Sequence, residues 1–173
     1  MTFRELIALI GEDWRAHGCD TSRAGFRTLA VYRFGVWRMS VRSGLLRWPL
    51  SFLYRRGFYR CRNVYGIELP YTVEVGRGVV IEHQGGIVIH GSTRIGDGCI
   101  IRQNCTLGVR RADRPGEAPT LHDRVDLGAG AVVLGNVTIG SGASIGANAV
   151  VLCDVPAGAL AIGVPATVRL RDG

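Results

Sequence analysis

Residues 127–152 read LGAGAVVLGNVTIGSGASIGANAVVL, and an aliphatic residue recurs at every sixth position of this stretch. Small residues commonly follow these aliphatic positions. Neither the 3.6-residue period of a helix nor the two-residue period of a strand explains a spacing of six. Internal repeats of this kind indicate a solenoid, in which each repeat buries its apolar face against its neighbours. The recurring aliphatic residues are Leu127, Val133, Ile139, Ile145 and Val151.

The same period extends back to Val75, but two interruptions break its phase. Ile81 is followed by Ile89 eight residues later, and Leu107 is followed by Leu121 fourteen residues later. Six residues make one short strand and a corner, so three repeats are expected to close a triangular coil of about eighteen residues. Residues added to such a coil must leave it as loops. Loops on a rigid scaffold commonly carry function, so both interruptions are candidate sites.

The N-terminal third of the chain has a different pattern, which predicts three helices. Thr2 and Glu5 form a capping-box signature, and apolar residues follow at helical spacing up to residue 17. Residues 22–40 and 44–60 give two further amphipathic patterns. The predicted organisation is a basic helical segment at 1–65, a β-helical domain at 66–168 with a projecting loop at 108–120, and a tail at 169–173.

The positive charge is concentrated in the helical segment. Residues 1–62 hold 12 arginines and four acidic residues, residues 63–173 hold nine arginines and ten acidic residues, and the net charge is +7. No zinc-finger or RNP-like pattern accompanies the arginines, so nucleic acid is not an expected partner. Two interpretations of the helices stay open. They cover one end of the body, or their arginines and aromatic residues contact an anionic membrane surface.

The cellular location is predicted from the cysteines and from the apolar runs. The five cysteines are odd in number and have no paired spacing, and Met1–Gly18 is charged throughout, unlike a signal peptide. The apolar run around Leu45–Tyr54 contains Arg47 and Pro49 and is too short to span a bilayer. We expect a cytoplasmic protein with reduced thiols, peripheral at the inner face of the membrane if the membrane interpretation holds.

Several segments resemble the hexapeptide-repeat acyltransferases, and in particular their serine O-acetyltransferase branch. They are VGRGVVIEHQGGIVIHGSTRIGDGCII at 75–101, TLG at 106–108, the repeats at 127–152 and the closing AIGVPA. The resemblance implies a mainly β fold, the left-handed parallel β-helix, with acetyl-CoA as acetyl donor and no metal. It also implies a homotrimer with active sites between subunits. The short helical segment is closer to small relatives of the colanic-acid type, which acetylate bacterial exopolysaccharides.

The first phase break carries the pair Glu82-His83. In the family that it resembles, the histidine of an Asp-His pair is the general base, and imidazole has a pKa suited to taking a proton from a hydroxyl near neutrality. The resemblance implies that His83 is the base, that Glu68 orients it from the preceding coil, and that Glu82 belongs to the acceptor site. The alternatives are a structural histidine at a corner and a solvated acid at Glu68.

The second phase break stands where the family has a loop that covers the acceptor. Arg110 and Arg111 are expected to meet an anionic substrate or the phosphates of CoA, with ordinary loop charges as the alternative. In this family CoA lies in a groove between subunits, mostly against backbone amides. The resemblance therefore implies three cofactor-binding positions: Ala129, Gly130 and Ala147.

The acceptor is predicted from the end of this loop. Serine acetyltransferases place an Arg-His pair before the closing proline, and the pair engages the region of the serine carboxylate. Here Glu117 and Ala118 precede Pro119, so that contact is missing. We therefore predict a hydroxyl acceptor without this carboxylate, a sugar of an exopolysaccharide or other cell-surface glycan, with L-serine as the alternative acceptor.

Two other functions share this architecture. The γ-type carbonic anhydrases hold zinc with three histidines, but His83 and His90 are seven residues apart across a phase break, which is not their ligand spacing. A non-catalytic β-helix would have no need of Glu68, Glu82 and His83 together. The sequence therefore favours an acetyl-CoA-dependent O-acetyltransferase over both.

Overall fold

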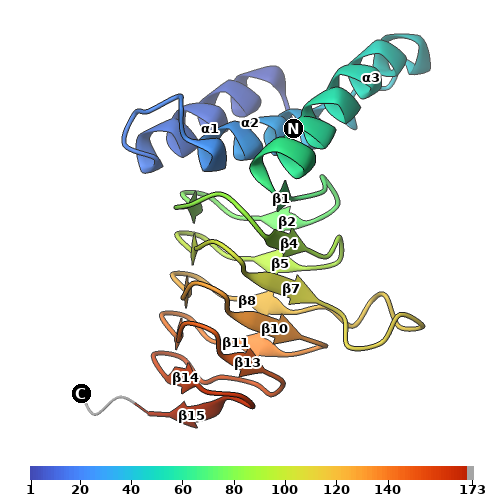
Figure 1. Cartoon of the computed structure of the whole chain (residues 1–173). Coiled ribbons are helices and arrows are strands. Elements are labelled where there is room, and N and C mark those ends of the chain that lie inside the picture. Colours follow the sequence, from blue (N-terminus) through green and yellow to red (C-terminus); the bar gives the residue numbers. More distant parts are fainter. Residues whose placement is uncertain (171–173) are drawn as a thin grey trace.

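The structure, a computed structural model that describes residues 1–170, is a prism of short strands capped at one end by helices (Figure 1). Three sheets form the faces of the prism, and every third strand of the main body returns to the same sheet. Within the described residues, the antiparallel pairing is that of β14 with β15 at the end away from the helices.

The strands are short, and each sheet takes one strand from each coil. The first sheet contains β1 (Ile67–Glu68), β4 (Ile87–Ile89), β7 (Thr106–Gly108), β10 (Val132–Leu134) and β13 (Val150–Val151). The second contains β2 (Glu74–Val75), β5 (Arg94–Ile95), β8 (Thr120–Leu121) and β11 (Thr138–Ile139). The third contains β3 (Val80–Ile81), β6 (Ile100–Ile101), β9 (Asp126–Leu127), β12 (Ser144–Ile145), β14 (Leu160–Ile162) and β15 (Thr167–Arg169). The tail predicted at 169–173 begins inside β15, and its residues 171–173 lie outside the described part.

The strand registers show how long each coil is. Val132 pairs with Val150, eighteen residues further along the chain. Ile67 pairs with Ile87, so the first coil has two extra residues, and Thr106 pairs with Val132, so the third coil has eight. The extra residues fall at the corner after β3 and in the loop after β7, where the sequence loses its phase. The triangular coil predicted from the repeat is therefore confirmed.

The recurring aliphatic residues fill the interior of the prism. Ile101, Leu107 and Val133 are completely buried, and the cluster is continuous from coil to coil. Burial of apolar surface, about 25 cal/mol per Å², is the main stabilising term for such a stack. Close contact between coils explains the small residues that follow the aliphatic ones. A Cβ added at Gly96 would lie 2.6–2.8 Å from atoms of the next coil, so a larger residue would force the coils apart.

Three helices and a short π-helical turn precede the prism: α1 (Phe3–Ala16), α2 (Ala24–Arg38), α3 (Gly44–Arg60) and η1 (Cys61–Tyr65). The predicted capping box is present, because Glu5 donates its backbone N–H to the Thr2 hydroxyl at 3.2 Å and Thr2 donates its own to the Glu5 carboxylate at 2.7 Å. The helix limits agree with the predicted ones to within two residues.

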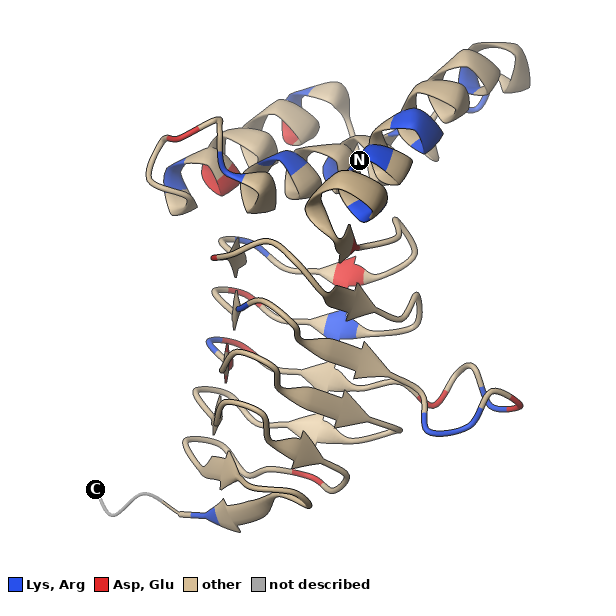
Figure 2. Cartoon of the chain, in the orientation of Figure 1, with Lys and Arg blue, Asp and Glu red and all other residues tan. Residues whose placement is uncertain are grey.

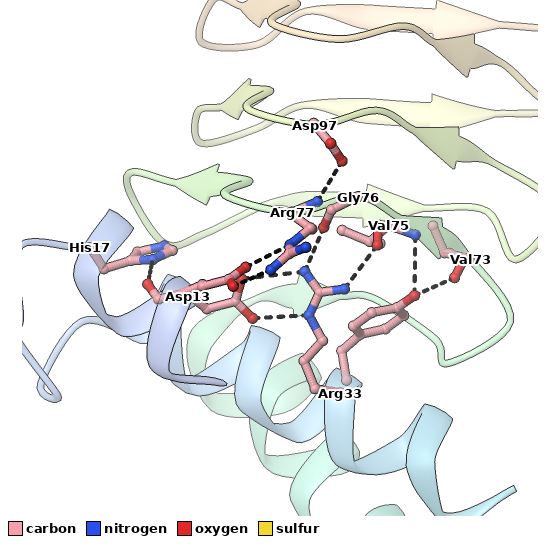
Figure 3. A network of polar contacts seen from close by, with 10 residues as sticks. Asp13, His17, Arg33, Val73, Val75, Gly76, Arg77 and Asp97 are labelled. Atoms are coloured by element: carbon pink, nitrogen blue, oxygen red, sulfur yellow. Dashed lines mark hydrogen bonds and ion pairs between the residues drawn. The ribbon is translucent and has the colours of Figure 1, made fainter. Parts of the chain in front are cut away.

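A buried ion pair joins α1 and α2 to the prism (Figure 3). The side chains of Asp13 and Arg33 are 0% and 5% exposed, and Arg33 Nε lies 2.9 Å from Asp13 Oδ2. The same guanidinium donates to the carbonyl oxygens of Val75 at 2.8 Å and Gly76 at 2.5 Å. Arg33 therefore links both helices to the strand β2 and the corner after it.

His17 joins the helices to β3, the strand that leads to the Glu82-His83 corner. This residue is buried, its Nδ1 lies 2.7 Å from the Asp13 carbonyl oxygen, and its Nε2 lies 3.2 Å from the backbone nitrogen of Ile81. These contacts require the tautomer in which Nδ1 donates and Nε2 accepts. The α1 helix is therefore bonded directly to the strand that precedes His83.

The α3 helix projects from the cap and is basic along its length (Figures 1 and 2). Leu45 and Trp48 are 89% and 73% exposed, and Phe52 is also exposed. The helix holds four arginines and no acidic residue. Among residues 1–170, no helix combines the length and apolarity needed to cross a bilayer. Contact of α3 with an anionic membrane surface stays a prediction.

Candidate active site

One edge of the prism, where the chain passes from the third sheet to the first, carries most of the predicted site residues. We call it the catalytic edge. Its successive corners are residues 82–86, 102–105, 128–131 and 146–149. Glu82 and His83 lie in the first of these corners, and the predicted cofactor-binding positions lie in the third and fourth. The structure thus brings together five residues that the resemblance selected: Glu82, His83, Ala129, Gly130 and Ala147.

Backbone hydrogen bonds hold the corners of the catalytic edge on top of one another. Asn104 donates its N–H to the Gly85 carbonyl at 2.8 Å, and Gly130 donates to the Gln103 carbonyl at 2.9 Å. Neighbouring coils are spaced by about 4.8 Å, so the corner with Gly130 lies roughly 10 Å along the edge from the corner with His83. An extended arm that ends in a thioester would span this distance.

The two extra residues widen the corner that carries His83. Gly85 and Gly86 have φ values of 103° and 64°, in the left-handed region that a residue without a Cβ adopts at low cost. Gly86 also lies directly against Asn104 of the next coil, where an added Cβ would clash. His83 is exposed, and within residues 1–170 it has no hydrogen-bond or ion-pair partner. The imidazole is therefore free to meet a substrate.

Glu82 belongs to a ladder of charges on the outer face of the third sheet. Its Oε2 lies 2.8 Å from Arg102 Nε, and Arg102 Nη1 pairs with Asp126 and lies 3.3 Å from the Leu127 carbonyl oxygen. The hydrogen bond that Arg102 donates to the Asp126 carboxylate raises the pKa of Arg102 above its usual value, against a smaller opposing effect of desolvation. The guanidinium is thus fixed between two carboxylates.

Sequence reasoning did not select Arg102, although a signal for it was present. Ile81 and Ile101 occupy the same interior position in successive coils and pair in register. The residues that follow them, Glu82 and Arg102, must then be neighbours on the outer surface. The repeat therefore predicts that Glu82 and Arg102 are neighbours of opposite charge at the catalytic edge. This prediction requires that the two extra residues be assigned to the corner after β3.

Glu68 is the second residue of β1, a strand of the sheet that begins at the catalytic edge. It pairs in register with Val88 of β4, which follows the His83 corner in the next coil, and its side chain is half-buried. Between Glu68 and His83, the described residues show no hydrogen bond or ion pair. Orientation of the imidazole by Glu68 therefore stays a prediction.

The Glu68→Gln variant tests that prediction. We expect kcat for acetyl transfer to fall by about 10-fold or more, a part of the 10²- to 10⁴-fold that a positioned base supplies. The KM for acetyl-CoA should change less than kcat, because Glu68 would act through the imidazole and not on the cofactor. Steady-state kinetics with varied acetyl-CoA measures both constants. An unchanged kcat would contradict the orienting function.

The loop after β7, residues 109–119, projects from a different edge of the prism (Figures 1 and 2). Its charges largely pair with one another: Arg111 with Asp113 at 3.0 Å, and Arg114 with Glu117 at 3.0 Å. This edge joins the first sheet to the second, whereas His83 lies where the third meets the first. Within one chain, Arg110 and Arg111 are therefore not brought to His83, and their binding function stays a prediction.

A polar cavity of about 390 Å³ lies where this loop rejoins the prism. Its lining includes Thr72, Ser92, Arg94 and Ala118, and it does not include His83. This cavity thus lies at the edge of the loop and away from the candidate base. Since ligand sites are normally concave, the His83 corner needs further walls to enclose a substrate.

Two alternative chemistries find no arrangement to support them in the described residues. Cys105 is buried, its Sγ lies 3.2 Å from the Gly128 carbonyl oxygen, and burial raises the pKa of its thiol, which disfavours the nucleophilic thiolate. A zinc site of the carbonic anhydrase kind needs several grouped ligands. Within residues 1–170, no three His, Cys, Asp or Glu residues are grouped so as to hold a metal ion.

Known proteins match this chain over most of its length. The family described as "Bacterial transferase hexapeptide (six repeats)" matches residues 118–153. The serine acetyltransferase of Helicobacter pylori (strain J99) is 41% identical over 128 residues, which cover 69% of this chain and 75% of that protein. The serine acetyltransferase of Synechococcus elongatus is 37% identical over 149 residues, 86% of this chain. The chain spans 58% of the length of this second relative.

Solved structures share the architecture. Soybean serine acetyltransferase complexed with serine matches with a TM-score of 0.80 and 30% identity, over 95% of this chain and 69% of that one. A serine acetyltransferase in complex with CoA matches with a TM-score of 0.79 and 27% identity, over 96% and 71% of the two chains. The predicted fold class, a mainly β, left-handed parallel β-helix with a helical N-terminal segment, is confirmed.

The prediction of a sugar acceptor is wrong, and the closer likeness to the colanic-acid type is not supported. The relatives and structures named above are serine acetyltransferases. The loop explains the error. Ala118 is buried, and the carboxylate of Glu117 is paired with Arg114, so neither residue presents a free group that would repel the carboxylate of serine. The absence of an Arg-His pair at this place therefore does not exclude an amino-acid acceptor.

The level of identity decides the family. It reaches 41% over 75% of the length of the Helicobacter pylori protein, and the architecture agrees with that of the soybean protein over 95% of this chain. The chain belongs to the serine acetyltransferase family of hexapeptide-repeat acyltransferases.

Proposed function

We propose that this chain is an acetyl-CoA-dependent O-acetyltransferase whose acceptor is the hydroxyl group of L-serine. The observation that carries the proposal is the catalytic edge. On it, an exposed His83, which has no partner within residues 1–170, stands in line with the small residues Ala129, Gly130 and Ala147. The names of the relatives support the acceptor. The neighbours complexed with serine and with CoA support the two ligands.

The reaction needs a base and an activated acyl group. The serine hydroxyl attacks the thioester carbonyl, and His83 takes the hydroxyl proton as the C–O bond forms. The C–S bond then breaks, and the imidazolium returns the proton to the departing CoA thiolate. The products are O-acetylserine and CoA. A covalent enzyme intermediate is unnecessary, because the thioester is already activated.

The catalytic edge fits an extended acetyl donor. Gly130 has a φ of 73°, and a Cβ at this position would clash with Asn148 of the next coil. Ala147 is exposed and Ala129 is half-buried, so small side chains leave the backbone of both corners open to a ligand. We place the pantetheine arm along these corners, with the thioester directed towards His83. Its use of acetyl-CoA makes a cytoplasmic location part of the proposal.

A homotrimer is the assembly that supplies the missing walls. The projecting loop and its cavity lie at one edge of the prism, and His83 lies at another. When three triangular prisms are arranged around a common axis, an edge of one faces a different edge of the next. The loop of a neighbouring subunit would then cover the His83 corner, as the family resemblance implies.

A coupled thiol-release assay tests the proposed activity. Purified chain with acetyl-CoA and L-serine is expected to release CoA with a kcat/KM for L-serine of about 10⁴ M⁻¹s⁻¹ or above, the usual enzymatic range. Release without L-serine measures the background hydrolysis of the thioester. If L-serine does not raise the rate above this background, the proposed acceptor is wrong.

A further inference from the structure

An amino-acid acceptor requires two opposite charges at its site. L-serine is a zwitterion, so a specific site needs an anion for its ammonium group and a cation for its carboxylate. In the loop, Arg111 and Arg114 are paired with Asp113 and Glu117, and Arg110 lies at an edge of the prism away from His83 of the same chain. A cation on the catalytic edge itself would meet the requirement without the loop.

Arg102 lies next to the residue that precedes the candidate base. Because Ile81 and Ile101 pair in register, Glu82 and Arg102 follow side by side at the ends of β3 and β6. Arg102 Nε lies 2.8 Å from Glu82 Oε2. The cation is thus built into the catalytic edge of the same chain that supplies His83.

The guanidinium still has a free side. Nε is used by Glu82, and Nη1 is used by Asp126 and by the Leu127 carbonyl oxygen. Within residues 1–170, Arg102 Nη2 donates no hydrogen bond and Glu82 Oε1 accepts none. One donor nitrogen and one acceptor oxygen therefore remain available, and they belong to two groups that already form an ion pair.

The geometry also makes Arg102 a rigid cation. Its side chain is 30% exposed and is held by two carboxylates on two different coils. A side chain that is already fixed loses little rotamer freedom when it binds a ligand. A lysine would not reproduce the arrangement, because a compact ammonium group cannot present the planar fork that serves Glu82, Asp126 and a ligand together.

We propose that Arg102 completes the acceptor site to which the resemblance assigns Glu82, and that the two residues together bind the amino-acid part of the acceptor. Glu82 Oε1 accepts a hydrogen bond from the ammonium group, Arg102 Nη2 donates to the α-carboxylate, and the hydroxyl group is left to reach His83. The two opposite charges of the protein then face the two opposite charges of the zwitterionic substrate. This assignment rests on the serine acceptor proposed above and makes Arg102 a specificity-determining residue.

The test compares acceptors that lack one charged group. Ethanolamine has the hydroxyl and ammonium groups of serine without the carboxylate, and 3-hydroxypropanoate has the hydroxyl and carboxylate without the ammonium. In Arg102→Gln we expect kcat/KM for L-serine to fall about 10- to 100-fold, the value of one charge-assisted contact. The value for ethanolamine should change by less than about 3-fold. In Glu82→Gln, kcat/KM should fall for L-serine and for ethanolamine, which both carry an ammonium group. It should not fall for 3-hydroxypropanoate, which has none.

Two further variants separate binding from folding. Arg23→Gln removes an exposed arginine, whose pairing with Asp20 is loose at 3.8 Å, and it should leave all three acceptors unchanged. Arg102→Lys keeps a cation between the two carboxylates, so it tests the proposal even if Arg102→Gln does not fold. It should lower the preference for L-serine over ethanolamine by about 3- to 10-fold, less than Arg102→Gln.

The outcomes that overturn the proposal are distinct. Equal losses with L-serine and ethanolamine in Arg102→Gln would show that Arg102 only holds Glu82 in place. An unchanged preference in both Arg102 variants would show that the guanidinium does not meet the carboxylate. If the unaltered chain does not turn over L-serine, the proposed function and this assignment are both wrong. If it turns over L-serine normally, and the Arg102 variants keep the same preference for L-serine over ethanolamine, only the assignment is wrong.

Discussion

The His83→Ala variant is expected to lose acetyl transfer by about 10²- to 10⁴-fold, the contribution of a positioned general base. Without the imidazole, the proton of the attacking hydroxyl must pass to water while the C–O bond forms. The fold should survive, because the side chain is exposed and makes no hydrogen bond or ion pair within residues 1–170. Release of CoA at saturating acetyl-CoA and L-serine, together with a thermal melt, measures both effects.

A second exposed histidine provides the control. His122 stands at the start of the corner between the second and third sheets, away from the catalytic edge. The His122→Ala variant should retain near-normal turnover, since loss of an exposed side chain there removes no group from the site. Near-normal turnover in both His83→Ala and His122→Ala would show that His83 is not the base. A loss in both would point to a general effect on the prism.

The repeat made the fold predictable because each of its rules is local. An inward position in a coil of about eighteen residues accepts only an aliphatic side chain, and the residue after it meets the next coil at short range. Ile101 and Gly96 show both rules, the first by complete burial and the second by the clash that a Cβ would cause. The same rules located the extra residues at the His83 corner and in the loop, since these are the places where the period fails.

The position of the helices over one end of the body was one of the two interpretations of the sequence, but the contacts that dock them were not predictable, because these join distant parts of the chain. Asp13 and Arg33 follow a pattern that is ordinarily typical of solvated helix faces, yet both are buried. His17 contacts Ile81, which is 64 residues away along the chain. No period in the sequence connects these positions. Only the packing of α1 and α2 on the first coils brings them together.

The acceptor was predicted wrongly for a related reason. The missing Arg-His motif indicates the loss of a function only if no other cation is near, since a carboxylate needs only a cation in the right place. Arg102 reaches Glu82 from the next coil, and this neighbour relation appears when the register is known. A motif located in one loop therefore says less about specificity than the groups that the fold collects around the base.

The Asp13→Ala variant is expected to lower the free energy of unfolding by about 3–5 kcal/mol, the cost of leaving a buried charge without its partner. Arg33 would keep its bonds to the carbonyl oxygens of Val75 and Gly76, but its positive charge would be uncompensated. The Asp20→Ala variant is the control, because its carboxylate is exposed, and its pairing with Arg23 at 3.8 Å and its hydrogen bond from the Ser22 N–H at 2.7 Å should together contribute much less, about 1 kcal/mol. Urea unfolding at equal protein concentration compares the variants.

The double variant Asp13→Leu with Arg33→Met separates the cost of an unpaired charge from the cost of lost packing. Apolar residues of similar volume in place of a buried ion pair are often neutral or stabilising, so most of the stability lost in Asp13→Ala should return. A loss below about 1 kcal/mol in the single variant would show that the pair does not hold the helices to the prism.

Weaker attachment of the helices should also affect the active site. His17 of the cap binds the backbone of Ile81, two residues before His83, so a loosened cap should also lower kcat at temperatures where the prism is still folded.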